Sequence, residues 1–274
     1  MESKQMLQAE LKEVEKWERE QTDSWFWERI GRIPFKLLDK VTPDFIHEKI
    51  GALLDELGSF VQTGGKYLTQ KSLVTKKFEN IVTDRPISSI DDIKALRIST
   101  MDKVSEELKE GRGKFATFQG ATTGFGGAFT LAADVTVLLG LSLKTLQEIA
   151  ISYGYDPNSR EERIFIVKCL QFASAGSSGK KSVLKELSSY FNENEKPQEV
   201  VSQIQGWREV VYTYRDQLGW KKLLQTVPVV GMVFGAWTNR SMIKDLAETG
   251  SMLYRKRRIV DRLKSMETEP VSTV

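Results

Sequence analysis

Four carboxylates of this chain have surroundings that favour chemistry: Asp134, Glu148, Asp156 and Glu162. Asp134 lies between two apolar runs, where an unpaired anion would be strongly unfavourable. We expect it either to cap the following helix, because Asp is favoured at helix N-termini, or to contact a ligand or metal with the other three. No histidine lies near these carboxylates, so we predict no metal site and no cofactor.

The remaining reactive side chains offer no catalytic arrangement. His47 is the single histidine, and its helical spacing beside Ile46 and Ile50 predicts a surface position without a nucleophile elbow around it. Cys169 is expected to be a small buried apolar residue. Asn239 is expected to be a cap or turn residue, or a buried amide that orients a ligand.

Two glycine-containing stretches match nucleotide-binding motifs only in part. Gly111-Arg112-Gly113 with Ala116 fits the pattern G-x-G-x-x-A, but that fingerprint requires a preceding strand, and a charged helix precedes it here. Residues 179–182, GKKS, lack the first glycine and the residue order of a phosphate loop. We therefore predict no nucleotide site at either place.

Charge and cysteine content narrow the classes of partner and compartment. The 274 residues hold 40 Lys and Arg against 37 Asp and Glu, a formal net charge of +3, so we expect no nucleic-acid partner. A single cysteine excludes an internal disulfide framework, and the N-terminal sequence has no apolar core of a secretory signal. Both features favour the cytoplasm.

Two segments combine basic residues with apolar or aromatic ones, as membrane-surface helices do. The candidates in the first segment are Trp25, Trp27, Arg32 and Lys36. The candidates in the second are Arg255, Lys256, Arg257 and Arg258. The first set either closes over the core or lies among lipid headgroups. The second is either a solvated helix end or a contact for anionic lipid.

The elements that must position these residues are helices, so we predict an all-α fold. Its centre is two Gly-rich apolar segments, at about 114–153 and 223–240, whose small residues allow helices to approach closely. Neither contains the roughly 18 consecutive apolar residues of a spanning helix.

The helix boundaries follow from capping residues. Ser89 is expected to begin a helix that Gly111 ends, Gly154 to end the central helix in the left-handed conformation, and Ser159 to open the next helix with a capping box. The second half of the central helix is expected to reach the surface at Lys144, Gln147 and Glu148.

Two long strings carry a family resemblance. They are GFGGAFTLAADVTVLLGLSLKTLQEIAISYGYDP with the following EER, and VPVVGMVFGAWTNRSMIKDLAETGSMLYRKR. With them the chain resembles the EcsC protein family from about Trp17 to Arg258. It departs from the family pattern at Val135-Thr136, where a proline is expected after the aspartate. The resemblance implies a helical cytoplasmic protein, named for a neighbour of ABC transporter components, with no established activity or cofactor.

These observations predict a charged and aromatic helix at 1–28, one EcsC-like helical domain at 29–266 and a disordered tail at 267–274. The leading functional hypothesis is a non-enzymatic protein on the inner face of the cell membrane that accommodates lipid or a hydrophobic partner between its Gly-rich segments. One alternative is an accessory or regulator of an ABC transporter, recognised around Lys144 and Glu148. A second is a carboxylate-dependent hydrolase centred on Asp134.

Overall fold

The computed structural model describes residues 2–22, 56–64, 68–123, 127–175, 177–191 and 228–268, with the backbone alone at 115–123, 127–136, 177–178, 189 and 228–239. Within these residues every regular element is a helix, which confirms the predicted all-α class. The named helices are α1 (Lys4–Thr22), α4 (Ser72–Glu79), α5 (Ile90–Lys94), α6 (Ile98–Thr123), α7 (Gly127–Ser152), α8 (Arg160–Ser174), α9 (Ser177–Phe191) and α11 (Pro228–Thr268).

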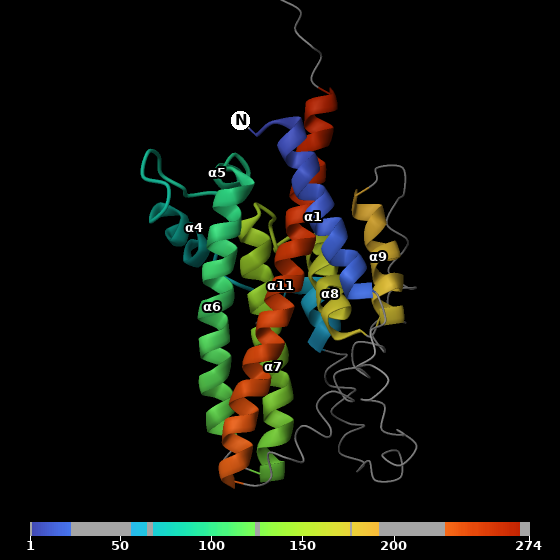
Figure 1. Ribbon diagram of the computed structural model, residues 1–274. Helices are drawn as coiled ribbons and strands as arrows, with labels where there is room; N and C mark the ends of the chain where they lie inside the picture. The colour runs from blue at the N-terminus through green and yellow to red at the C-terminus, as the bar shows by residue number, and fades with distance from the viewer. Residues whose placement is uncertain are drawn as a thin grey trace, which may run out of the picture.

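The long helix α11 is the axis of the arrangement (Figure 1). Helices α6 and α7 form an antiparallel hairpin beside its first half, and α6 makes the most extensive contact with it. Helix α1 runs antiparallel along the second half of α11, since Lys4 pairs with Glu267 while Trp17 donates a hydrogen bond to Glu248. Helices α8 and α9 complete the bundle on the side of α1.

The core lies where α6, α7, α8 and α11 meet. Helix α7 is buried along most of its second half, with Leu146 and Ile149 fully inside. We predicted from the sequence that Lys144, Gln147 and Glu148 are exposed. Lys144 is exposed, but Gln147 and Glu148 are buried, so the prediction is wrong for these two residues. Their polarity is satisfied by internal partners rather than by water, as buried polar groups require.

Helix α5 begins as predicted, but the helix after it does not end where predicted. Ser89 and Asp92 form a reciprocal capping box. The chain leaves helical geometry after Lys94, resumes it at Ile98 and continues through Gly111 to Thr123. Helical glycine costs about 1 kcal/mol. A Cβ would meet nothing within 4 Å at Gly111, whereas at Gly113 it would lie 3.1 Å from the Lys244 side chain of α11.

Gly154 ends α7 in the left-handed conformation, as predicted, with φ +78°. The Gly154 amide donates to the Ile151 carbonyl, and the Tyr155 amide donates to the Ala150 carbonyl, both at 2.9 Å. This pair of bonds is the Schellman motif, which satisfies carbonyls that the helix end would otherwise leave unpaired. The chain therefore reverses tightly into α8.

The two positions predicted as caps or turns in the apolar segments lie inside helices. Helix α7 begins at Gly127, so Asp134 is not its N-cap. Helix α11 begins at Pro228, so Asn239 is not a turn residue. Both predictions are wrong, because the Gly-rich sequences before these residues are themselves helical. The side chains of Asp134 and Asn239 lie outside the described part of the structure.

Two glycines with opposite environments provide a test of this packing. Gly154→Ala is expected to reduce the free energy of unfolding by about 1–3 kcal/mol, because its φ is left-handed and its new Cβ would lie 2.7 Å from Lys94 Cγ. Gly111→Ala is expected to raise it by about 0.5–1 kcal/mol, since α6 is open there. Urea denaturation measures both, and equal effects would contradict the assignment.

Candidate functional site

The α7–α8 turn and the second half of α11 come together at the centre of the structure. The guanidinium of Arg258 donates to the Tyr153 carbonyl at 2.9 and 2.6 Å and to the Gly154 carbonyl at 3.2 Å. These are carbonyls at the C-terminus of α7, where the helix dipole favours a cation. The two strings that carry the family resemblance thus meet in space.

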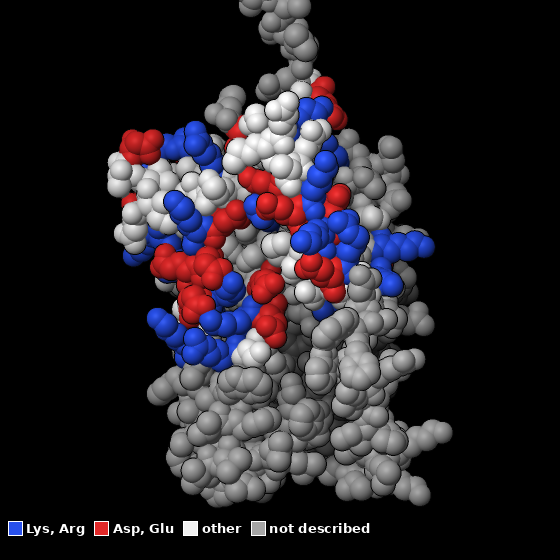
Figure 2. Space-filling view, in the orientation of Figure 1, with Lys and Arg blue, Asp and Glu red and all other residues white. Residues whose placement is uncertain are grey.

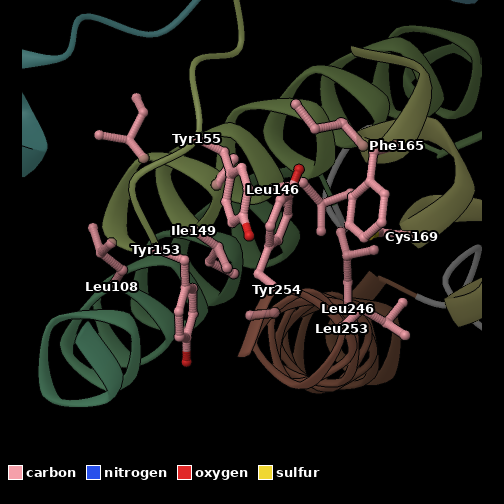
Figure 3. Packing of buried hydrophobic residues seen from close by; sticks show 14 of the residues in the cluster. Leu108, Leu146, Ile149, Tyr153, Tyr155, Phe165, Cys169, Leu246, Leu253 and Tyr254 are labelled. Atoms are coloured by element: carbon pink, nitrogen blue, oxygen red, sulfur yellow. The ribbon is translucent and has the colours of Figure 1, made fainter. Parts of the chain in front are cut away.

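Next to this contact, Arg257 lies in a cluster of aromatic rings. Its guanidinium carbon is 4.3 Å from the centre of the Tyr155 ring, 4.8 Å from that of Phe165 and 5.5 Å from that of Tyr190. Figure 3 shows Tyr155, Phe165 and Tyr254 converging from the α7–α8 turn, α8 and α11. Planar guanidinium groups are suited to such stacking.

The charge of Arg257 is balanced by Glu162, at 2.9 Å. Glu162 also accepts a hydrogen bond from the Tyr254 hydroxyl. Ser159 caps α8 through the Glu162 amide, but the Glu162 side chain turns inward to these two partners. The predicted reciprocal capping box is thus only half formed, because the buried ion pair uses the carboxylate.

Burial controls proton binding in this cluster. It raises the pKa of the Glu162 carboxyl above its ordinary value, and the Arg257 charge offsets only part of the increase. Burial also raises the pKa of the Cys169 thiol well above its ordinary value. A thiol of this kind stays protonated and is a poor nucleophile. The Arg257–Glu162 ion pair and the aromatic rings around it therefore hold α8 against α11.

The basic run on α11 is not the solvated helix end considered from the sequence. Arg255 contacts Glu10 of α1 at 3.6 Å and Asp102 of α6 at 3.3 Å. Lys256 contacts Glu18 of α1 at 2.7 Å. The side chains of Arg255 and Lys256 are less than one-fifth exposed, and α11 continues beyond them to Thr268. The correction follows from the amphipathic α1, whose carboxylates cover the run.

The other predicted carboxylates occupy separate places. Glu148 pairs with Arg112 of α6 through two hydrogen bonds, one of them 2.7 Å long. Asp156 pairs with Lys71 at 2.7 Å. Each carboxylate therefore has its own cation, and no group of three His, Cys, Asp or Glu suited to a metal occurs in the described ranges.

Several predicted residues lie outside the described part of the chain. They are His47 and the first membrane-surface set, which consists of Trp25, Trp27, Arg32 and Lys36. The side chains of Asp134 and Asn239 also lie outside it, although their backbone lies in α7 and α11. The membrane-surface roles of the first set, the surface position of His47 and the ligand contacts of Asp134 and Asn239 remain predictions.

A second feature lies at the opposite end of the helices from the basic run. The last residues of α6 and the first residues of α7 and α11 lie together at one end of the molecule (Figure 1). Residues 115–123, 127–133 and 228–239 contain no Lys, Arg, Asp or Glu. We call these three segments the charge-free end. Among the described helices, none is both long and apolar enough to cross a membrane.

Two arrangements were missed at the level of sequence. The first is the pairing of Glu10 and Glu18 with the basic run. Leu7, Leu11 and Val14 form an apolar stripe at helical spacing, which indicates that α1 packs on another helix with carboxylates beside the contact. The second missed arrangement is the meeting of three charge-free segments. The sequence did not indicate that α6 contributes one of them, because α6 was expected to end at Gly111 and instead continues to Thr123.

The ion pair at the centre is open to a double-mutant test. Arg257→Met is expected to reduce the free energy of unfolding by about 3–5 kcal/mol, because it leaves Glu162 buried without its cation. Adding Glu162→Gln is expected to recover part of this loss, since both charges are then removed. Arg160→Met, at an exposed position of α8, serves as the control. Additive effects in urea denaturation would contradict the pairing.

The acidic contact around Arg255 predicts a pH dependence of stability. Burial raises the pKa of Asp102 above 3.8 and that of Glu10 above 4.5. The folded state therefore binds these protons more readily, and its stability falls as pH rises through the folded-state pKa values. Asp102→Asn is expected to make this decline shallower in urea denaturation above pH 3.8. An unchanged slope would contradict the assignment.

Comparisons with known proteins show the family of this chain. The model of the EcsC protein family matches residues 8–259. "Uncharacterized protein YdbA" of Bacillus subtilis (strain 168) is 56% identical over 98% of both chains. "Protein EcsC" of the same organism is 25% identical over 86% of this chain and 88% of its own. No solved structure gives a significant match. The chain therefore belongs to the EcsC protein family.

Proposed function

We propose that this EcsC-family protein is a non-enzymatic peripheral membrane protein that inserts its charge-free end into one leaflet of a bilayer. The observation that carries the proposal is the meeting of three helical segments without charged residues at one end of the molecule. An apolar surface grouped in this way is typical of a membrane or protein contact rather than of scattered surface residues.

The length of the charge-free end supports insertion into one leaflet. Its α6 segment of residues 115–123 extends about 14 Å and its α11 segment of residues 228–239 about 18 Å, at 1.5 Å a residue. Half of the hydrocarbon core of a bilayer is about 15 Å. The segments thus match a single leaflet.

The shape of the end also supports the proposal. Three neighbouring helices can turn only part of each circumference toward one another, and the remainder faces outward. The three segments contain no Lys, Arg, Asp or Glu, and Phe, Val, Met, Ala, Thr and Gly make up most of their residues. Val137 of α7, four residues beyond this region, is 50% exposed. The small residues allow the three backbones to approach closely without a large side-chain core.

Most of the backbone in such an end is paired without water. All three segments are helical, so their amide and carbonyl groups are paired within each helix except in the last turn of α6 and the first turns of α7 and α11. This is the requirement that lipid imposes on any inserted backbone.

The remaining functional hypotheses stay predictions. An accessory role beside an ABC transporter was expected to use a surface around Lys144 and Glu148, but Glu148 is buried against Arg112. Only Lys144 of that surface is exposed. A hydrolase centred on Asp134 would require a side chain outside the described part of the structure. No contact among the described residues favours either hypothesis over the membrane proposal.

Depth measurement with a fluorescent label tests the proposal. Thr123→Cys, at the end of α6, is expected to give a label that acyl-chain quenchers in vesicles reach. Ser265→Cys, at the other end of α11, is the matched control and is expected to stay unquenched. Cys169 is fully buried and is not expected to react with the label. Equal quenching at the two sites would contradict insertion. A label at Thr123→Cys that protein alone covers, so that the acyl-chain quenchers do not reach it, would also contradict insertion.

A further inference from the structure

We propose that Lys114, Lys144 and Arg240 form a basic ring that binds the phosphate groups of anionic phospholipids. We call these three residues the basic ring. Each comes from a different helix, α6, α7 and α11, and each is exposed to solvent. This inference rests on the proposed insertion of the charge-free end, and it adds the chemistry of the lipid.

Side-chain contacts between the helices place the three cations within about two helical turns of one another along the bundle. Lys244 of α11 pairs with Glu110 of α6, and a Cβ on Gly113 would lie 3.1 Å from Lys244. Arg240 is therefore one turn nearer the charge-free end than Lys244, and Lys114 directly follows Gly113. Both residues lie at the inner border of the charge-free end.

The third cation is placed by the contact between α6 and α7. Glu148 pairs with Arg112, and Lys144 lies one turn nearer the charge-free end than Glu148. Helical side chains lean toward the N-terminus of their own helix. For α7 and α11 this direction leads toward the charge-free end, and the flexible stems of Lys144 and Arg240 can extend the reach of their charges.

The spacing of these cations fits a membrane surface. The three residues fall within about two helical turns along the bundle, or roughly 11 Å. The headgroup region on one side of a bilayer is about 5–8 Å thick, and long basic side chains adjust to it by snorkelling. Insertion of the charge-free end would therefore bring the basic ring to the level of the phosphates. Asp134 of α7, ten residues before Lys144, would then lie about 15 Å to the lipid side of the basic ring, where its carboxyl group would have to be protonated or paired.

The charges of the basic ring are largely unused inside the protein. Arg240 has a single ion-pair contact within the described residues, at 3.9 Å from Glu110. Glu110 is already held by Lys244. For Lys114 and Lys144 no ion pair is found within the described ranges. Figure 2 shows basic side chains, with acidic ones beside them, along the lower border of the described surface on this face.

The contrast with the basic run on α11 decides which cations are available. Arg255, Lys256 and Arg257 are paired with carboxylates of α1, α6 and α8. An anionic lipid would have to displace these partners before it could bind there. The basic ring has no comparable competition, although its residues are dispersed in sequence.

Vesicle binding by matched triple variants tests the basic ring. The ring variant carries Lys114→Gln, Lys144→Gln and Arg240→Gln, and the control carries Lys76→Gln, Arg85→Gln and Arg160→Gln at exposed positions away from the charge-free end. Both variants lose the same charge. Vesicles of phosphatidylcholine alone are compared with vesicles that also contain phosphatidylglycerol, by flotation and titration.

The ring variant is expected to lose about a hundredfold in affinity for vesicles with phosphatidylglycerol, or about fivefold for each cation. The control variant is expected to bind as the unmodified protein does, and added salt is expected to reduce the difference. Equal binding by the two triple variants would overturn the basic ring.

The label at Thr123→Cys separates this result from the proposed function. If the label is quenched in both kinds of vesicle while the ring variant binds normally, insertion stands and the basic ring is wrong. If the label is quenched in neither, the proposed function is wrong, and the ring proposal falls with it.

Discussion

The buried contact between Glu162 and Arg257 is the interaction on which the arrangement of the helices depends. It joins the start of α8 to the second half of α11 inside a group of aromatic rings. Neither charge has water to replace its partner, so the pair requires that both helices keep their positions. Arg258 adds a second constraint, because it binds the carbonyls that end α7.

This contact explains why one end of α11 is rigidly organised around charges. The basic run meets carboxylates from α1, α6 and α8, so each cation contributes to holding a different helix. Such pairing uses charges for geometry rather than for solvent contact or binding. The other end of α11 lies among segments without charges, and close approach of small residues is the interaction available to it.

The two ends therefore suit different tasks. The charged end fixes the relative positions of α7, α8 and α11 through directional contacts. The charge-free end contains no Lys, Arg, Asp or Glu for such contacts, and an apolar surrounding would stabilise it more than water would. The proposed membrane insertion follows from this difference, with the basic ring at the boundary between the two regions.

The sequence by itself determined the helical class, the family and the local helix ends at Ser89 and Gly154. These features depend on capping residues and on apolar spacing within a few turns, which are local properties. It did not determine where Gly111, Asp134 and Asn239 fall in their helices, because tertiary packing outweighs the low helix propensity of glycine-rich segments. It also could not show that α1 covers Arg255 and Lys256, or that Lys114, Lys144 and Arg240 lie near one another along the bundle. Those relations join residues far apart in the chain, and only the packing of α6, α7 and α11 decides them.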